Sequence, residues 1–449
     1  MQKNDIFEGE VVDLTHEGLG VVKSDNFPFF VENAMPGEWL RLRVTKIGKT
    51  FGFARVEEFL SKSDKRVEST NMDYLRTGIA DLAHLTYDEQ LKFKKHQVET
   101  VLSKAGVSVH VADVFPAEEV TGYRNKAQIP VRSLNGELTT GFFRKHSHQL
   151  LPIENFYIQN PEIDEIILDL RNLLRESGLT AYDERTNKGL VRNIVVRRAH
   201  KTGEIMIVLV LSKAVKIDFS QVIMRFPGIK SIQYSIKTDR GNAIFGKAFE
   251  VIYGQNFITD ELLGKKFQIS AQSFYQVNST QAERLYQTAY DFADLKPTDT
   301  IVDAYSGIGT VGLCVADRVA QVYGMEVVAA AVENAKENAA LNGFSNVHYE
   351  VGTAEEVMPR WQAQGVRPDV IFVDPPRKGL DESFVKTAAQ MSARAIVYIS
   401  CNPATFARDA VRFEEAGYQL ERVQPVDLFP QTHHVELVGK FINNEKVSN

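Results

Sequence analysis

Cys401 is the residue whose surroundings most favour covalent chemistry. It stands in the stretch VYISCNPATFARDA, directly after an apolar run that predicts a strand, and is one of only two cysteines in 449 residues. Pro403 suits the first turn of a helix, and the positive end of that helix would stabilise a thiolate on Cys401. A thiolate is a nucleophile, whereas a lone cysteine is most commonly a buried structural residue. Both interpretations stay open from these residues alone.

A candidate base lies near the C-terminus, in the segment FPQTHHVELV. Glu436 falls within an apolar strand there, where partial burial would raise the pKa of its carboxyl group toward the working pH. His433 and His434 compete for the same role, although histidines at the start of a strand are more often ordinary polar residues. The sequence therefore offers one nucleophile and three candidate bases.

A glycine-rich segment, DAYSGIGTVG from Asp303 to Gly312, follows a predicted strand and is expected to open a helix. Gly307 lets the backbone approach a ligand closely, and Glu326 ends the next strand, where its carboxylate can accept from ribose hydroxyls. The motif alone fits a dinucleotide or S-adenosylmethionine, or a turn without a ligand. Asp303 favours S-adenosylmethionine, because a carboxylate there can meet the cationic amino acid part of that cofactor but would repel a pyrophosphate.

The segment FVDPPRKG places Asp374 at the end of a later strand. Pro375 and Pro376 remove two amide donors and hold the chain extended beside the carboxylate. In an adenosylmethionine enzyme this segment shapes the pocket for the target base, and a following aromatic residue would suggest methylation of an exocyclic amine. Arg377 stands in that position, which argues against amine chemistry.

A thiol and a base beside a methyl donor suit methylation of a pyrimidine carbon. The C5 carbon of uracil is not nucleophilic enough to be methylated unaided. Addition of a thiolate to C6 gives an enolate with negative charge at C5; a base later removes the C5 proton and the thiol is eliminated. Cys401 and Glu436 could supply these two functions.

Three regions of different pattern must position these residues. Residues 1–60 form short alternating apolar runs between Gly, Pro, Asn and Asp, the pattern of a small β-barrel. Residues 61–120 are predicted helical, with a helix over 85–105 that could pack on the catalytic region. Strands and helices then alternate through the last third of the chain, which predicts a doubly wound parallel sheet with ligands outside the carboxyl ends of its strands.

We therefore expect a multidomain protein. The three domains are an N-terminal RNA-binding β-barrel over residues 1–60, a central α+β RNA-binding domain over 61–270 and a C-terminal α/β methyltransferase domain over 271–449. No internal repeat or low-complexity tract is evident.

Charge is distributed unevenly, although the net charge is -6. Three basic clusters are interleaved with aromatic residues, a composition typical of nucleic-acid surfaces, while balance by nearby acids is the alternative. The clusters are Arg41, Arg43, Lys46, Lys49 and Arg55; Arg124, Lys126, Arg132, Arg144 and Lys145; and Lys188, Arg192, Arg197, Arg198 and Lys201.

The sequence predicts a cytoplasmic protein. No run approaches the ~18 apolar residues of a membrane span, and the N-terminus lacks the apolar region of a signal peptide. Cys314 and Cys401 lie in different kinds of segment, which suits a reducing compartment.

With these features together, residues 271–449 resemble the catalytic domain of the RNA uracil-C5 methyltransferases, and the stretches SCNPATFARD and HHVELV carry the resemblance. Residues 1–60 resemble the TRAM barrel that precedes this domain in the members that act on 23S ribosomal RNA. The resemblance implies a Rossmann-like class I methyltransferase domain that uses S-adenosylmethionine. It implies formation of 5-methyluridine in 23S rRNA, at one site or two, on a uridine flipped out of a loop. No membrane and no obligate protein partner is expected.

The resemblance also assigns roles to single residues. Cys401 becomes the nucleophile and Glu436 the base. Phe274 matches an aromatic residue that stacks on the flipped base, and Asp374 matches a residue that contacts the uracil. Contacts to the cofactor carry over to Gln276, Tyr305, Glu326 and Asp374.

One segment departs from the family pattern. Many relatives hold an iron-sulfur cluster with four cysteines, three of them just before a helix beginning HxxYxxQLxxK. Here the region reads RTGIADLAHLTYDEQLKFKK, and Thr77 to Ala80 contain no cysteine. Two cysteines cannot ligate such a cluster, so the chain resembles the cluster-free bacterial branch, and no metal site is expected.

Three other functions stay open. The chain could methylate transfer RNA, although transfer RNA relatives usually lack the barrel. The glycine motif and Glu326 also suit an NAD-dependent oxidoreductase, which would leave the SCNP stretch without a task. A non-catalytic RNA-binding protein on the same scaffold is the third, and Cys401, Glu436 and Asp374 argue against it.

Overall fold

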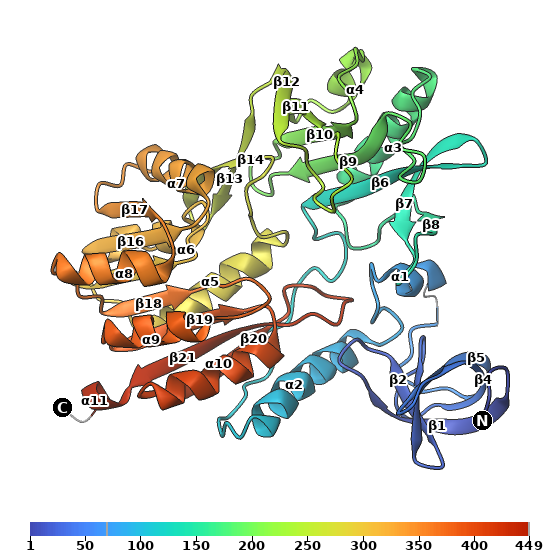
Figure 1. The fold of residues 1–449 in the computed structure, drawn as a ribbon, viewed down its shortest axis with the longest axis horizontal. Helices are drawn as coiled ribbons and strands as arrows, with labels where there is room; N and C mark the ends of the chain where they lie inside the picture. The colour runs from blue at the N-terminus through green and yellow to red at the C-terminus, as the bar shows by residue number, and fades with distance from the viewer. Residues whose placement is uncertain (69–70, 448–449) are drawn as a thin grey trace.

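Three β-sheets follow one another along the chain, and a two-stranded sheet lies between the second and the third (Figure 1). The computed structural model describes residues 1–68 and 71–447. No helix within these ranges is both long enough and apolar enough to span a bilayer.

The N-terminal sheet is a closed barrel of five strands in the order β1-β2-β3-β5-β4. Alternate side chains of β4, namely Leu40, Leu42 and Val44, point inward and are fully buried, as the period of two predicts. The predicted barrel is confirmed. Its strands are β1 (Ile6–Leu14), β2 (Gly20–Ser24), β3 (Phe27–Val31), β4 (Trp39–Ile47) and β5 (Gly52–Ser61).

Two helices follow the barrel, α1 (Met72–Thr77) and α2 (Tyr87–Lys104), and α2 packs against α10 and β20 of the C-terminal sheet. The helical pattern predicted for residues 61–120 is wrong beyond α2. The run VSVHVADVFP after Gly106 is extended, and it bridges to β20 at Val111 and Phe115. Its alternating β-branched residues and its proline disfavour a helix.

The central sheet has seven strands in the order β12-β11-β10-β9-β6-β7-β8. Helix α3 (Pro161–Glu176) starts where the Asn160 side chain accepts from the Glu162 amide, and its apolar residues pack on this sheet. The strands are β6 (Lys126–Leu134), β7 (Glu137–Phe143), β8 (Leu150–Pro152), β9 (Val191–Arg198), β10 (Ile205–Leu211), β11 (Ile229–Ile236) and β12 (Ala248–Gly254). Helix α4 is Ser220–Arg225, and the hairpin β13 (Phe257–Leu262) and β14 (Lys265–Ser270) leads onward.

The C-terminal sheet has the order β17-β16-β15-β18-β19-β21-β20. Its first five strands are parallel, and β21 runs antiparallel to both neighbours. The strands are β15 (Thr300–Ala304), β16 (Gln321–Glu326), β17 (Val347–Val351), β18 (Val370–Val373), β19 (Ala395–Ser400), β20 (Tyr418–Val426) and β21 (Glu436–Asn443). Strand order reverses between β15 and β18, and such a reversal opens a crevice at the carboxyl ends of the strands.

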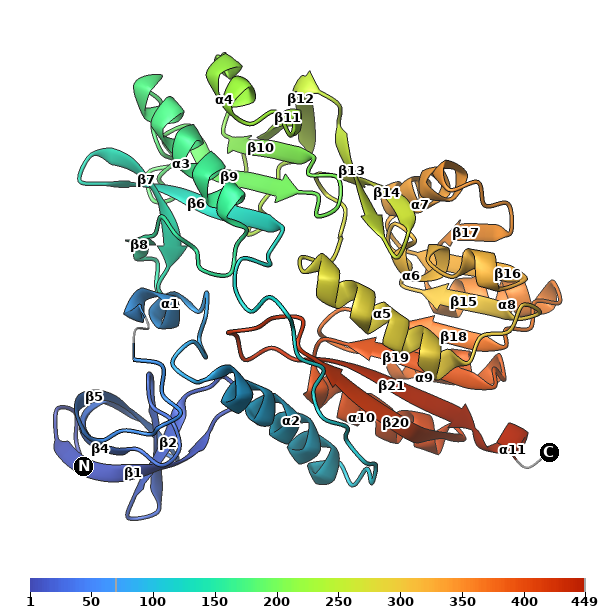
Figure 2. The same ribbon diagram turned by 180° about the vertical axis from the view of Figure 1, so that it is seen from behind.

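Helices cover both faces of this sheet, so its central strands β18 and β19 are buried along their whole length. Phe372 and Val397 join the core beneath α5, whereas Ile371 and Ile396 join the core on the opposite face. Figure 1 shows α8, α9 and α10 in front of the sheet, and Figure 2, the view from behind, shows α5 on the opposite face. The helices are α5 (Ser279–Ala293), α6 (Thr310–Leu313), α7 (Ala329–Leu341), α8 (Ala354–Ala363), α9 (Glu382–Gln390), α10 (Pro403–Glu415) and α11 (Asn444–Val447).

Candidate active site

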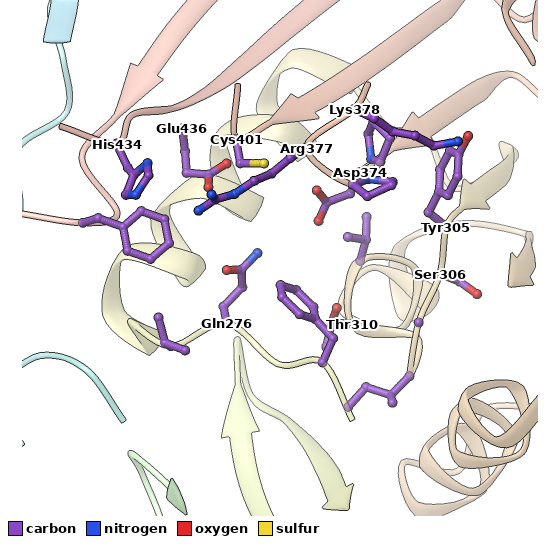
Figure 3. Close-up of a pocket in the computed structure, with 18 of the residues that line it drawn as sticks. Gln276, Tyr305, Ser306, Thr310, Asp374, Arg377, Lys378, Cys401, His434 and Glu436 are labelled. Atoms are coloured by element: carbon purple, nitrogen blue, oxygen red, sulfur yellow. The ribbon is translucent and has the colours of Figure 1, made fainter. Parts of the chain in front are cut away.

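A cavity of about 1050 Å³ opens at the carboxyl ends of β15, β18 and β19. Its opposite wall comes from the central sheet, through Gln128 and Phe142, and from the end of α1 and the residues after it, through Thr77 and Ile79. Of the nine residues expected to act as nucleophile or base or to contact the cofactor or the uracil, with His433 and His434 left aside, eight line it: Phe274, Gln276, Tyr305, Gly307, Glu326, Asp374, Cys401 and Glu436. Figure 3 shows Cys401, Glu436 and Arg377 grouped together, with Asp374 and Gln276 facing the same space.

The position of Cys401 follows from β19 and α10. The residue comes directly after β19, and the Asn402 side chain caps α10 by accepting from the Ala404 amide at 3.1 Å. Asn402 Nδ2 also donates to the Arg377 carbonyl at 3.1 Å, which ties the cysteine turn to the loop after β18. Cys401 is therefore half-buried at the end of the sheet and open to the cavity.

Cys401 stands at the N-terminal end of α10, as the sequence predicts, but its other surroundings disfavour a thiolate. Burial raises the pKa of Cys401 to about 12, and the nearby carboxyl groups of Glu436 and Asp374 raise it further, while Arg377 opposes them. These influences favour the thiol of Cys401 over its thiolate.

Glu436 faces Cys401 because of strand register. In the antiparallel pair of β19 and β21, Ser400 lies opposite Leu437, and continuing this register by one residue sets Cys401 opposite Glu436. Glu436 is buried, and burial raises the pKa of its carboxyl group to about 8; Asp374 raises it further and Arg377 lowers it. A carboxylate with this pKa is a competent base near neutral pH.

The two histidines occupy different surroundings. His434 lines the cavity, but burial lowers its pKa to about 3, with His433 and Arg377 adding to the effect, so its imidazole is neutral and a weak base. The His433 ring does not line the cavity, and its Nδ1 lies 2.7 Å from Asp81 Oδ2. Of the three candidate bases, Glu436 has the most suitable position and pKa.

The glycine turn after β15 builds the other end of the cavity. Gly307 and Gly309 adopt φ values of 54° and 89°, a region that favours glycine, and the helix they open, α6, is a single turn. Glu326 accepts from the Gly307 amide at 3.2 Å and from the Val328 amide at 3.0 Å. The turn and the end of β16 are thus held together by one carboxylate.

Asp303 does not reach the cavity, contrary to its predicted contact with the cofactor. It is buried beneath the turn, and its Oδ2 accepts from the Gly312 amide at 2.8 Å. A Cβ at Gly312 would come within 3.0 Å of this oxygen, so the glycine allows the close approach. Burial raises the pKa of Asp303 to about 7, and the residue shapes the turn from below.

The cavity fits S-adenosylmethionine. Glu326 offers a carboxylate beside Val327, an apolar residue that lines the cavity and is nevertheless 61% exposed. Tyr305 contributes an aromatic wall that packs on Phe384 with ring centroids 5.4 Å apart. Asp374 adds a second acidic group, buried and with a pKa raised by burial to about 7. A ribose, an adenine and a cationic sulfur would each meet a matching group. Within the described ranges no group of three or more His, Cys, Asp or Glu could hold a metal ion.

Several cavity residues were not assigned a role from the sequence. Arg377 was noticed only as a departure from amine chemistry, yet it lies beside Glu436, Asp374 and Cys401. The walls from Thr77, Gln128 and Phe142 come from distant regions that meet only in the fold. The alternation in KAQIPVR marks a strand but does not tell which of its faces turns toward the cavity.

The basic clusters are partly neutralised. In the barrel Arg41 pairs with Glu8 and Glu58, and Arg43 pairs with Glu57, so balance by acids accounts for these two arginines. In the central sheet Arg124, Lys126 and Arg197 are close to one another, and no acidic group acts on any of them within the described part of the chain. Arg124 lines the cavity.

Comparisons with known proteins agree with this site. A family model described as tRNA (Uracil-5-)-methyltransferase matches residues 86–444. A Lactococcus lactis protein called "Uncharacterized RNA methyltransferase YljE" is 62% identical over 447 residues, which is 98% of this chain and 97% of that protein. An uncharacterized RNA methyltransferase of Streptococcus mutans is 55% identical over 448 residues, covering 98% of this chain and 99% of its own.

A solved structure extends the likeness over the whole chain. The Pyrococcus abyssi tRNA (uracil-54, C5)-methyltransferase, in complex with S-adenosyl-L-homocysteine, superposes with a TM-score of 0.79 at 28% identity. The match covers 97% of this chain and 99% of that one, so it includes barrel, central sheet and C-terminal sheet.

Proposed function

This chain belongs to the S-adenosylmethionine-dependent RNA uracil-C5 methyltransferase family, and on that premise we propose that it forms 5-methyluridine in 23S ribosomal RNA through a covalent bond between Cys401 and C6 of the target uridine. The observation that carries the covalent scheme is the strand register that sets Cys401 opposite Glu436 at the mouth of the cavity. The NAD-dependent oxidoreductase and the non-catalytic RNA-binding protein lose their support with the family assignment.

The proposed reaction uses two residues of this chain in turn. The Cys401 sulfur, once deprotonated, bonds to C6 of the uracil, and the electron pair of the C5–C6 double bond moves to C5. After C5 is methylated, the Glu436 carboxylate takes the C5 proton, the double bond forms again and the C6–S bond breaks. S-adenosylmethionine, when bound, supplies a methyl group on a positively charged sulfur.

Other cavity residues are proposed to orient the substrates. Gln276, Tyr305, Glu326 and Asp374 would hold the cofactor, and Asp374 would also contact the uracil. Gly307 would bring the backbone close to the cofactor. Phe274 lines the cavity and is 71% exposed, as expected of an aromatic side chain that stacks on a flipped base.

An RNA grip is supported by unpaired cations near the cavity. Burial lowers the pKa of Lys126 to about 7, and Arg197 and Arg124 lower it further. Arg197 is buried and donates to the Ser270 and Ser273 carbonyls, so Arg124 and Lys126 are the cations of this cluster that RNA phosphates would compensate. We propose that the barrel over 1–60 and the central domain over 61–270 bind RNA in the cytoplasm. The domain over 271–449 is proposed to be Rossmann-like, which the order of its sheet supports.

The choice of ribosomal RNA is supported by the resemblance to the barrel-containing ribosomal enzymes. The second candidate substrate is transfer RNA, which the Pyrococcus abyssi neighbour favours. Because that match covers 97% of this chain, the expectation that transfer RNA enzymes lack the barrel no longer separates the two substrates.

Mapping 5-methyluridine in total RNA from a deletion strain tests the proposal. Loss of the modification at one or two 23S positions, restored by the wild-type gene and not by Cys401→Ala, is expected. Loss confined to transfer RNA would support the second candidate. Unchanged 5-methyluridine in both RNA classes would overturn the proposed activity.

A further inference from the structure

The segment between β20 and β21 delivers both Glu436 and His434 to the cavity. It runs from Asp427 to Val435 outside the sheet, so strand hydrogen bonds do not fix its course. Its residues are nevertheless largely buried, which means that other parts of the chain must hold it. The helix α2 and the loop before it do so.

One face of α2 grips the start of this segment. Tyr87 donates its hydroxyl to Asp427 Oδ2 at 2.8 Å. Two helical turns further, Lys94 Nζ lies 2.5 Å from Asp427 Oδ1 and donates to the Phe429 carbonyl at 3.0 Å. The side chains of Lys94 and Asp427 are both fully buried. A buried pair of this kind is geometrically demanding, and it leaves Asp427 little freedom.

Gln90 lies between them on the same face and grips the middle of the segment. It donates to Gln431 Oε1 at 3.0 Å and accepts from the Gln431 amide at 2.9 Å. Leu82, just before α2, donates its amide to the Gln431 carbonyl at 2.9 Å. Gln431 is held on its side chain, its amide and its carbonyl.

Asp81 holds the end of the segment. Its Oδ1 accepts from the His433 amide at 2.8 Å, and its Oδ2 lies 2.7 Å from His433 Nδ1. Lys145 of the β7–β8 loop lies 3.9 Å from the same oxygen. The His433 ring in turn lies on the His434 ring, with centroids 4.1 Å apart. Asp81 therefore acts on the residue next to one that lines the cavity.

We infer that Asp81, Tyr87, Gln90 and Lys94 are positioning residues of the active site, and we call them the α2 clamp. The inference rests on the proposed function. By fixing the segment from Asp427 to His433, the clamp anchors the connection that leads into β21, and together with the pairing of Glu436 to Val426 it holds Glu436 in line with C5 of a uracil bonded to Cys401. Tyr87, Gln90 and Lys94 are also the Y, Q and K of the HxxYxxQLxxK pattern, which thereby has a task in this chain.

The test uses two substitutions. Asp81→Asn replaces one carboxylate oxygen with an amide nitrogen and leaves the shape of the side chain almost unchanged. Gln90→Leu removes the hydrogen bonds to Gln431. Lys92→Gln is the matched control, because the Lys92 side chain is 70% exposed on α2 and pairs with Glu89 of the same helix. Single-turnover methylation, denaturant-resistant protein–RNA adduct, S-adenosylmethionine affinity and thermal melting are measured for each full-length protein.

A misplaced Glu436 slows the proton transfer more than the earlier bond to C6, so adduct must accumulate. Each clamp variant is expected to release methylated RNA about 10- to 100-fold more slowly, to accumulate adduct, and to keep its cofactor affinity within about twofold. The control should match wild type. If activity falls only with the folded fraction and no adduct builds up, or if it does not fall, the clamp inference is wrong. Should Gln90→Leu not fold, Asp81→Asn decides. Wild-type protein that forms neither 5-methyluridine nor adduct would remove the proposed function, and the clamp with it.

Discussion

At the scale of single residues, the thiol of Cys401 and the carboxyl group of Glu436 lie in surroundings that disfavour their ionised forms. The raised pKa values increase the pH needed for the proposed activity. Cys401 has a pKa raised to about 12, chiefly by burial, and Glu436 has one raised to about 8 for the same reason. The same low-polarity surroundings that hinder ionisation make the thiolate and the carboxylate more reactive once formed. The cavity therefore makes the ionised forms of Cys401 and Glu436 less populated but more reactive.

Replacing the base should trap the covalent intermediate. Glu436→Gln removes the group that we propose takes the C5 proton, while bond formation between Cys401 and C6 remains possible. We expect a protein–RNA adduct that survives denaturing gels and a turnover that falls about 10²- to 10⁴-fold. Cys401→Ala, the matched control, should give neither adduct nor methylation and should still bind RNA. Normal turnover of Cys401→Ala would contradict the covalent scheme.

Activity and stability should respond to pH in opposite directions. Activity needs a Cys401 thiolate as well as ionised Glu436, so the single-turnover rate should rise with pH through about 8, an apparent value that Glu436 shares with Asp374, and should continue to rise above it because the pKa of Cys401 is higher still. The free energy of unfolding should change with pH in the opposite direction and fall as the pH rises. A carboxyl whose pKa is raised in the folded state stabilises it fully at pH below its ordinary value of 4.5 and loses that contribution as pH rises through about 8.

Thermal melting between pH 5 and 9 measures the stability half of this prediction. The melting temperature of wild type should fall across the range, and Glu436→Gln, which cannot ionise, should show a shallower fall. Equal slopes for the two proteins would show that Glu436 has an ordinary pKa.

At the scale of elements, regular strand and helix patterns could be predicted from the sequence, whereas the paths of connecting segments could not. The barrel follows from alternation, and the β19 and α10 junction follows from an apolar run that ends at Asn402 and Pro403. Residues 107–116 do not follow the helical prediction made for 61–120, because their path depends on β20, which lies some three hundred residues away in sequence. Asp303 was misplaced for a similar reason: a motif marks the turn but not which side of it a carboxylate occupies.

The contact between α2 and the segment after β20 should carry much of the local stability. Lys94→Met leaves the Asp427 carboxylate buried without its cation, which costs about 3–5 kcal/mol of unfolding free energy. The double variant Lys94→Met with Asp427→Asn removes the uncompensated charge and should recover part of this loss. Urea unfolding of full-length protein measures both.

A neighbour on the same helix provides the control. Lys95 pairs with Asp113, whose side chain is 93% exposed, and Lys95→Met should change stability by less than about 1 kcal/mol. If Lys94→Met costs no more than Lys95→Met, the buried pair contributes nothing and α2 is held by apolar packing alone.

At the scale of the whole molecule, the cavity belongs to no single region. Its walls come from the segment after α1, the central sheet and the C-terminal sheet, so its shape is decided by how these parts meet. This explains why sequence motifs could point to Cys401 and Glu436 as residues of the cavity, while the walls from Gln128 and Phe142 could not be predicted. A uridine reaches such a junction only if the rest of the RNA is held outside it.

The barrel offers a surface for that purpose. Phe51 is 40% exposed and stacks on Phe30 with ring centroids 5.1 Å apart, in the turn between β4 and β5 that also carries Lys49. Aromatic rings beside cations suit unpaired bases, and one stacked base contributes about 1–3 kcal/mol. Phe51→Ala should therefore raise the KM for RNA about tenfold, with kcat and cofactor affinity unchanged.

Trp39 makes the matched control, because it is 44% exposed on the same barrel but lies at the opposite end of the β4–β5 hairpin, paired with Ser61. Trp39→Ala should leave the KM for RNA near the wild-type value. Equal effects of the two substitutions would mean that loss of barrel stability, and not loss of a stacking surface, weakens RNA binding. A fall in kcat with unchanged KM for Phe51→Ala would instead place the barrel in the step that delivers the uridine to Cys401.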